Sequence, residues 1–106
     1  MDLIAMIGDE PDIAQFKSIV NDILALNRRA HEEYQPIVDQ LIRNGCRDAF
    51  SIERTLDGLL DFCGYGPILT LYRRLCRHYY QIDPTATAAY VYAYYECWES
   101  PTTKSE

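Results

Sequence analysis

The residues best suited to recognition or chemistry form a basic island in the second half of the chain. The island runs from Tyr72 to Tyr80, YRRLCRHYY, and on a helix its outward-facing side chains are Arg73, Arg74, Arg77 and Tyr80. Guanidinium groups beside aromatic rings bind phosphates and carboxylates and stack on nucleobases. Three uses stay open: contact with nucleic acid, contact with an acidic protein, or a surface whose arginines pair with carboxylates of the same chain.

Aromatic residues crowd the segment that follows the island. Tyr90, Tyr92, Tyr94 and Tyr95 cannot all face inward on one helix. Tyrosine and tryptophan are enriched at interfaces, where they bury a large area and keep a polar tip. We expect an exposed aromatic surface, used for a partner or for self-association; the alternative is a core helix whose hydroxyls reach solvent. The candidate contact residues of this segment are Tyr92, Tyr95 and Trp98.

An acidic ridge precedes the island. Glu53, Asp57 and Asp61 recur every four residues and share one helix face. A regular acidic ridge can imitate a phosphate backbone, but it is far more often an ordinary solvated face. It is also the nearest partner for Arg73 and Arg77 if two helices pair as a hairpin, in ion pairs worth about 0–1 kcal/mol each.

Groups that could catalyse a reaction or bind a metal are few and badly spaced. Only Cys76 and His78 stand close together, and a spacing of two splays them apart on a helix. A thiol–imidazole pair of Cys76 with His31 or His78 has no motif behind it. The sequence has no glycine-rich phosphate loop, H-E-x-x-H or G-x-S-x-G. We therefore expect no catalytic residue, no metal site and no cofactor, in a protein that is not an enzyme.

The composition is that of a small acidic globular domain. Ten Lys and Arg against sixteen Asp and Glu give a net charge of −6 over 106 residues, which argues against a general binder of nucleic acid or anionic membranes. The span from Gly64 to Ile82 nevertheless contains no acid. The four cysteines form no C-x-x-C, and we see no signal peptide and no apolar run near the ~18 residues of a membrane span. We expect a reduced, cytoplasmic protein.

The apolar spacing predicts the helices that position these residues. Acids and Pro11 mark a helix start, and residues 11–35 show a 3-and-4 spacing that predicts one broad buried face. Pro36 either kinks this helix or ends it, and the pattern runs on to Gly45. The residues of the expected buried face are Ile13, Phe16, Ile19, Val20, Ile23, Asn27, Ala30 and Tyr34, widened by Leu24 and Leu26.

Three further helices are expected. The first, capped by Asp48 or Ser51, carries the stripe Ile52, Leu56, Leu59, Leu60 and Cys63. Gly58 inside it is unfavourable for a helix, and close approach of another helix is one explanation that the sequence alone does not show. A turn at 64–67, with Gly64 left-handed, opens the second. Asp83-Pro84 opens the last, which runs to about Trp98. The second helix is expected to bury Ile68, Leu71, Tyr72, Leu75, Cys76 and Tyr79.

These elements predict an all-α fold. We expect a single domain of residues 1–98, with four or five helices packed as antiparallel hairpins and a radius of gyration of about 13 Å. Residues 1–8 are expected to form a packed N-terminal arm, and residues 99–106 a disordered tail.

At LDGLLDFC, LYRRLCRHYY and IDPTATAAYVYAYYE the chain resembles small uncharacterised acidic proteins carried by conjugative elements and phages of Gram-positive bacteria. The likeness covers roughly residues 51–98 and contains no motif of known chemistry. It implies an accessory protein that binds and blocks a host factor, of the anti-CRISPR or anti-restriction type. It implies no catalytic residues.

The function predicted from the sequence is non-enzymatic protein binding, as an accessory or an inhibitor, with the blocking of a nucleic-acid-processing complex as one form. The contact surface would be the aromatic helix together with Arg73 and Arg77 or with the acidic ridge. One alternative is a small nucleic-acid-binding regulator that uses Arg73, Arg74 and Arg77. Another is a self-associating structural protein, a homodimer, and no membrane partner is expected.

Overall fold

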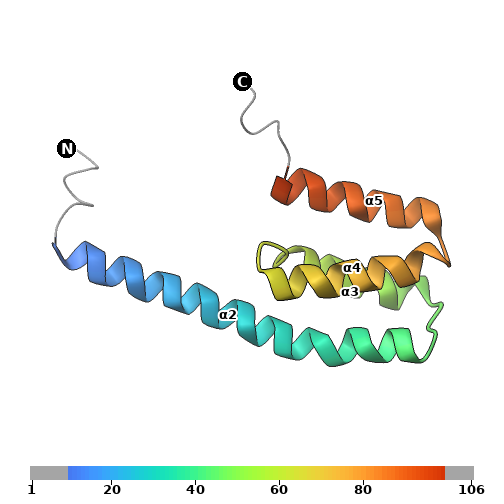
Figure 1. Cartoon of the computed structure of the whole chain (residues 1–106), viewed down its shortest axis with the longest axis horizontal. Helices are drawn as coiled ribbons and strands as arrows, with labels where there is room; N and C mark the ends of the chain where they lie inside the picture. The colour runs from blue at the N-terminus through green and yellow to red at the C-terminus, as the bar shows by residue number, and fades with distance from the viewer. Residues whose placement is uncertain (1–9, 100–106) are drawn as a thin grey trace, which may run out of the picture.

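The computed structural model describes residues 10–99, which form four α-helices and one short π-helix (Figure 1). These are α2 (Glu10–Arg43), α3 (Ala49–Leu60), α4 (Gly66–Tyr80), α5 (Pro84–Tyr94) and the π-helix η1 (Tyr95–Glu99). Residues 10–99 contain no strand, so the predicted all-α fold is confirmed. The arm expected at 1–8 lies outside the described residues, as does the tail expected at 99–106 except for Glu99, which belongs to η1.

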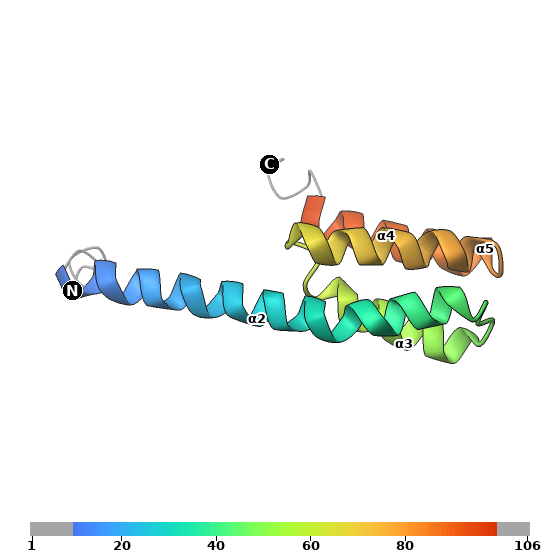
Figure 2. The same cartoon turned by 60° about the horizontal axis from the view of Figure 1, so that its bottom comes forward.

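The bundle is built around α4, which packs against α2, α3 and α5. Figure 1 shows α2 and α5 on opposite sides of α3 and α4, and Figure 2 shows α4 beside α5 and α2 beside α3. All of the residues predicted to face inward on α4 are buried, and they make up six of the twelve buried apolar residues. Burial of each such side chain contributes about 1.5–3 kcal/mol, so α4 supplies the largest part of the core.

Local signals set the starts of two helices as predicted. Asp48 caps α3 by accepting a hydrogen bond from the Ser51 N–H at 3.1 Å. Asp83 caps α5 in the same way, accepting from the Ala86 N–H at 3.0 Å, and Pro84 is the first residue of the helix. Each cap satisfies a backbone donor that no helical carbonyl can reach.

The turn after α3 differs from the prediction. Gly45, at the end of α2, has a left-handed φ of 62°, whereas Gly64 does not have a positive φ. The prediction for Gly64 was wrong because the chain leaves α3 through successive tight turns. In these turns the N–H groups of Phe62 and Tyr65 bond to carbonyls three residues earlier, which right-handed backbone conformations allow.

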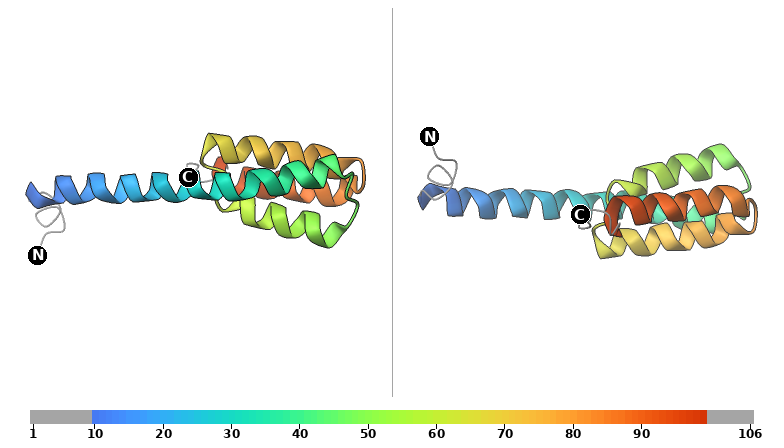
Figure 3. Two further views of the ribbon diagram at one scale, coloured as in Figure 1. Left: turned by 90° about the horizontal axis from the view of Figure 1, so that it is seen from below. Right: turned by 90° about the horizontal axis from the view of Figure 1, so that it is seen from above.

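α2 is one continuous helix that passes through Pro36 and extends well beyond the bundle (Figure 3). Ala30 and Val38 are buried, but Ile13 and Phe16 are 64% and 66% exposed. The prediction of one broad buried face was therefore wrong for the N-terminal half of α2, because no other described helix lies beside it. The radius of gyration is 17.8 Å, larger than the value of about 13 Å expected for a compact chain.

Gly58 of α3 lies directly against the side chain of Tyr34 on α2. A Cβ placed on Gly58 would lie 2.0 Å from the Tyr34 hydroxyl oxygen and 2.8 Å from Cζ of the same ring. Glycine lowers helix stability by roughly 1 kcal/mol relative to alanine, so the Tyr34 ring accounts for its presence inside α3.

Replacing Gly58 by alanine is expected to lower the free energy of unfolding by about 1–3 kcal/mol, because the added methyl group collides with the Tyr34 ring. In a Tyr34→Leu background, the same change should instead raise stability by up to about 1 kcal/mol. Urea unfolding of the two single variants and the double variant measures the coupling. Equal effects of Gly58→Ala in both backgrounds would contradict this account.

Candidate interaction surface

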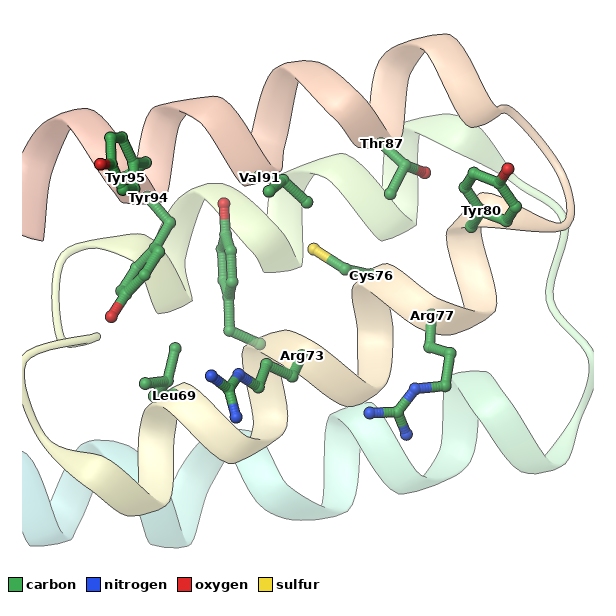
Figure 4. A pocket seen from close by; sticks show the side chains of 10 residues that line it. Leu69, Arg73, Cys76, Arg77, Tyr80, Thr87, Val91, Tyr94 and Tyr95 are labelled. Carbon is green, nitrogen blue, oxygen red and sulfur yellow. The ribbon is translucent and has the colours of Figure 1, made fainter. Parts of the chain in front are cut away.

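A groove runs along the outside of the bundle between α4 and α5 (Figure 4). Its volume is about 440 Å³, within the range of sites that hold a small ligand or the side chains of a bound peptide. It is lined by Leu69, Tyr72, Arg73, Cys76, Arg77, Tyr80, Thr87, Val91, Tyr94 and Tyr95. The lining therefore combines an apolar floor with two cations and contains no carboxylate.

The two cations stand on one side of the groove, and Tyr80, Tyr94 and Tyr95 stand at its ends. Figure 4 shows Arg73 and Arg77 on α4, with Val91 facing them from α5. Tyr80 stands at one end of the groove, and Tyr94 and Tyr95 stand at the other. Residues four apart lie on the same face of a helix, which is why α4 presents both arginines to the groove.

The structure divides the basic island predicted from the sequence. Arg73, Arg77 and Tyr80 belong to the groove, but the Arg74 guanidinium lies 2.8 Å from the Asp39 carboxylate of α2. This is the one ion pair among residues 10–99, so neither groove arginine is paired with a described carboxylate. Arg74 is only one position away from Arg73, and that step of about 100° turns it toward a different helix.

The acidic ridge does not pair with the arginines. Glu53 accepts a hydrogen bond from the Tyr79 hydroxyl at 2.5 Å, and Asp57 accepts one from the Tyr90 hydroxyl at 2.8 Å. These bonds join α3 to α4 and to α5. Burial and the bond to Glu53 raise the pKa of Tyr79 to about 12, and burial and the bond to Asp57 likewise raise the pKa of Tyr90. Asp61 remains an exposed carboxylate.

The remaining aromatic candidates lie away from the groove. Tyr92 is 63% exposed, and a hydrogen bond to Glu96 raises the pKa of its hydroxyl. Trp98 packs over Gly64, where a Cβ would come within 2.7 Å of its ring, and its Nε1–H donates to the Leu60 carbonyl at 2.9 Å. Trp98 therefore packs against the turn after α3, and the aromatic candidates do not form one continuous patch.

Three lining residues were not singled out by sequence reasoning: Leu69, Thr87 and Val91. Thr87 is buried, and its hydroxyl donates to the Asp83 carbonyl at 2.9 Å inside α5. Leu69 follows the buried Ile68 directly, and Val91 lies four residues after Thr87 on the same face of α5. The four-residue spacing of Thr87 and Val91 was the signal in the sequence, but the tyrosines around them made the inward face of α5 hard to recognise.

Cys76 and His78, which were considered as a catalytic pair, face different sides of α4. Cys76 lies on the groove floor, and burial raises the pKa of its thiol to about 11, so thiolate is scarce at neutral pH. His78 faces another side of α4, where its Nε2 donates to the Cys46 carbonyl at 2.7 Å. Within residues 10–99, no group of three or more His, Cys, Asp or Glu side chains is placed to hold a metal ion.

Similarity to other proteins adds nothing to this geometry. The chain matches no protein-family model, and no curated protein or solved structure is significantly similar to it. Within the described residues, no helix combines the length and the apolar character needed to cross a bilayer. The candidate surface therefore depends on the groove itself.

The Tyr79–Glu53 bond gives a test of this geometry at high pH. Because the pKa of Tyr79 is raised above its ordinary value of 10 to about 12, its stabilising effect is complete below pH 10 and is lost as the pH rises from 10 to 12. Tyr79→Phe should lower the free energy of unfolding at pH 8 by about 0.5–1.5 kcal/mol. It should also make the fall in stability between pH 10 and pH 12 less steep.

Urea unfolding at a series of pH values measures both effects. Tyr80→Phe is the matched control, because Tyr80 is 61% exposed on the next position of α4 and should leave stability almost unchanged. A wild-type and a Tyr79→Phe protein that lose stability in parallel above pH 10 would show that the bond to Glu53 does not hold the hydroxyl neutral.

Proposed function

We propose that this protein acts by binding another protein and that the α4–α5 groove is its contact surface. The observation that carries the proposal is the groove lining, in which Arg73 and Arg77 stand beside an apolar floor without a described carboxylate partner. Aromatic residues and arginine are the side chains most enriched at the energetic centres of protein interfaces. Tyr80 and Tyr95 supply the aromatic part and remain 61% and 45% exposed.

The chemistry of the groove defines the partner segment. An apolar floor that includes Val91, 53% exposed, fits aliphatic or aromatic side chains on one face of a bound helix or strand. Two guanidinium groups on one side fit carboxylates on the flank of that segment, because an arginine fork binds a carboxylate through two hydrogen bonds. The partner is therefore an acidic, amphipathic segment of another protein.

Two features favour a protein over nucleic acid. Arg74 is used in an ion pair with Asp39, so the three-arginine patch expected of a nucleic-acid regulator is reduced to two groups. The net charge of −6 opposes general attraction to a polyanion. Attachment to one component of a larger assembly is how such a protein would serve as an accessory or an inhibitor, the role implied by its resemblance to proteins of mobile elements. The proposal includes no catalytic residue, cofactor or metal.

The double variant Arg73→Glu/Arg77→Glu is expected to weaken partner binding at least tenfold, because both cations are replaced by charges that repel the acidic segment. The full-length tagged protein is used to capture partners from nuclease-treated lysate of its native cells. Arg47→Glu/Arg54→Glu, at exposed positions outside the groove, makes the same change in net charge and serves as the control.

The proposal requires a protein that the wild type and the control capture and the groove variant does not. If the wild type, the control variant and the groove variant captured a partner equally well, the groove would not be the surface that binds it. Fluorescent DNA and RNA oligonucleotides decide the alternative: binding that depends on Arg73 and Arg77 and weakens steeply between 50 and 200 mM salt, an ionic-strength range typical of phosphate contacts, would identify a nucleic-acid regulator instead.

A further inference from the structure

The N-terminal half of α2 is an apolar surface that nothing in the described chain covers. Every side chain from Ile13 to Leu26 is exposed, and Figures 1 and 3 show this part of α2 projecting past the end of the bundle. We call residues 10–27 the α2 arm. Its large apolar side chains, 36% to 66% exposed, are Ile13, Phe16, Ile19, Val20, Ile23, Leu24 and Leu26.

The exposed stripe is a continuation of the face that packs inside the bundle. Phe16, Val20, Ile23 and Asn27 follow the alternating 3-and-4 spacing, and the same spacing leads on to the buried Ala30. This repeat is the signature of helices that pack along one another at a shallow angle. The arm therefore carries the same kind of packing face as the C-terminal half of α2, but no described helix packs against it.

We propose that a second copy of this chain covers the stripe, with the two arms packed antiparallel about a two-fold axis close to Val20. Such a contact is isologous and closes on itself as a dimer. The inference does not depend on the α4–α5 groove, which shares no lining residue with the arm.

The length of the arm selects the antiparallel arrangement. The exposed stretch begins at Ile13 and ends where the bundle begins at Asn27, so its midpoint is Val20. When two such arms pair about that midpoint, the tip of each arm reaches the bundle of its partner without overlapping it. Each tip then lies at the corner between arm and bundle, a hollow lined by Ile23, Leu26, Asn27, Asp61, Phe62, Gly64, Tyr65 and Trp98. The corner offers apolar surface to the incoming tip.

Charge along the arm agrees with this arrangement. The first turn of α2 carries the acids Glu10 and Asp12 in the sequence, whereas Arg28 and Arg29 stand at the junction with the bundle. Antiparallel arms place each acidic end against the basic end of the partner, and they also oppose the two helix dipoles. Parallel arms would place like charges together at both ends.

The area is also that of a dimer contact. Seven large apolar side chains on one helix face leave several hundred Å² of apolar surface, and monomeric proteins rarely expose more than roughly 300–600 Å² in one patch. A standard protein interface buries about 800 Å² on each partner, and the corner adds further apolar surface to that of the stripe.

The oligomeric state of the full-length protein tests the proposal. Light scattering at several concentrations should give twice the mass of the 12.3 kDa chain, and Phe16→Glu/Ile23→Glu should weaken the dimer at least a hundredfold. Ser18→Glu/Ala25→Glu adds the same charge on the opposite, exposed face of the arm and should remain a dimer. Circular dichroism confirms folding of each variant, because Phe16 and Ile23 lie outside the core.

A wild type that stays monomeric at 100 µM, a concentration well above the micromolar range of ordinary specific complexes, would overturn the proposal and leave the stripe to another occupant. A dimer that Ser18→Glu/Ala25→Glu weakens as much as Phe16→Glu/Ile23→Glu does would overturn it as well.

Cysteine cross-linking tests the orientation. In a background with the accessible thiols removed by Cys46→Ser and Cys97→Ser, chains carrying Ile13→Cys are mixed with chains carrying Asn27→Cys and treated with a short bis-maleimide. Antiparallel arms should give the mixed cross-link and little Ile13→Cys homodimer, because the two Ile13 positions would be about 20 Å apart. Preferential Ile13→Cys homodimer cross-linking would show parallel arms and refute the proposed arrangement.

Discussion

The structure depends on the burial of α4 between three other helices. An amphipathic helix normally needs cover on one side, but α4 buries Ile68, Leu71, Leu75 and Tyr79 as well as Tyr72. Covering this wide face takes the C-terminal half of α2, the stripe of α3 and part of α5 together. The buried tyrosine hydroxyls set the register, since Tyr72 donates to the Tyr90 carbonyl of α5 at 2.7 Å and Tyr79 donates to Glu53 of α3.

The groove lies where the surface of α4 is not fully covered by the other helices. α5 covers α4 from one side only, and its contact is made through Thr87, Tyr90 and Tyr94. The next face of α4 carries Arg73 and Arg77, which are exposed and line the groove. The same constraint that fixes the core therefore leaves two cations beside an apolar floor.

Much of this could be predicted from the sequence, because the signals concerned are local. The inward face of α4 and the Asp48 and Asp83 caps each follow from residue spacing or backbone chemistry within one helix turn. The exposed half of α2 could not be predicted, because apolar periodicity is the same whether the covering helix belongs to the same chain or to another.

The composition of the groove was predictable only in part, for a related reason. Arg73, Arg74 and Arg77 look equivalent as a basic cluster, and their separation depends on where α2 lies around α4. The hydrogen bonds of Glu53 and Asp57 to tyrosines of other helices depend likewise on the packing of three helices. Contacts between helices are set by the assembled bundle, and a single sequence does not show them.

The passage of α2 through Pro36 without a break has a consequence for everything attached to its far end. Residues 10–43 form one rod of about 50 Å at 1.5 Å per residue. The helix therefore fixes how the face of its tip is rotated about the helix axis relative to the bundle. Adding or deleting one residue near the junction would turn the tip by about 100° relative to the bundle while leaving both locally intact. Insertions or deletions in this part of the chain would therefore be confined to lengths, such as seven residues, that keep the apolar face of the tip in nearly the same orientation.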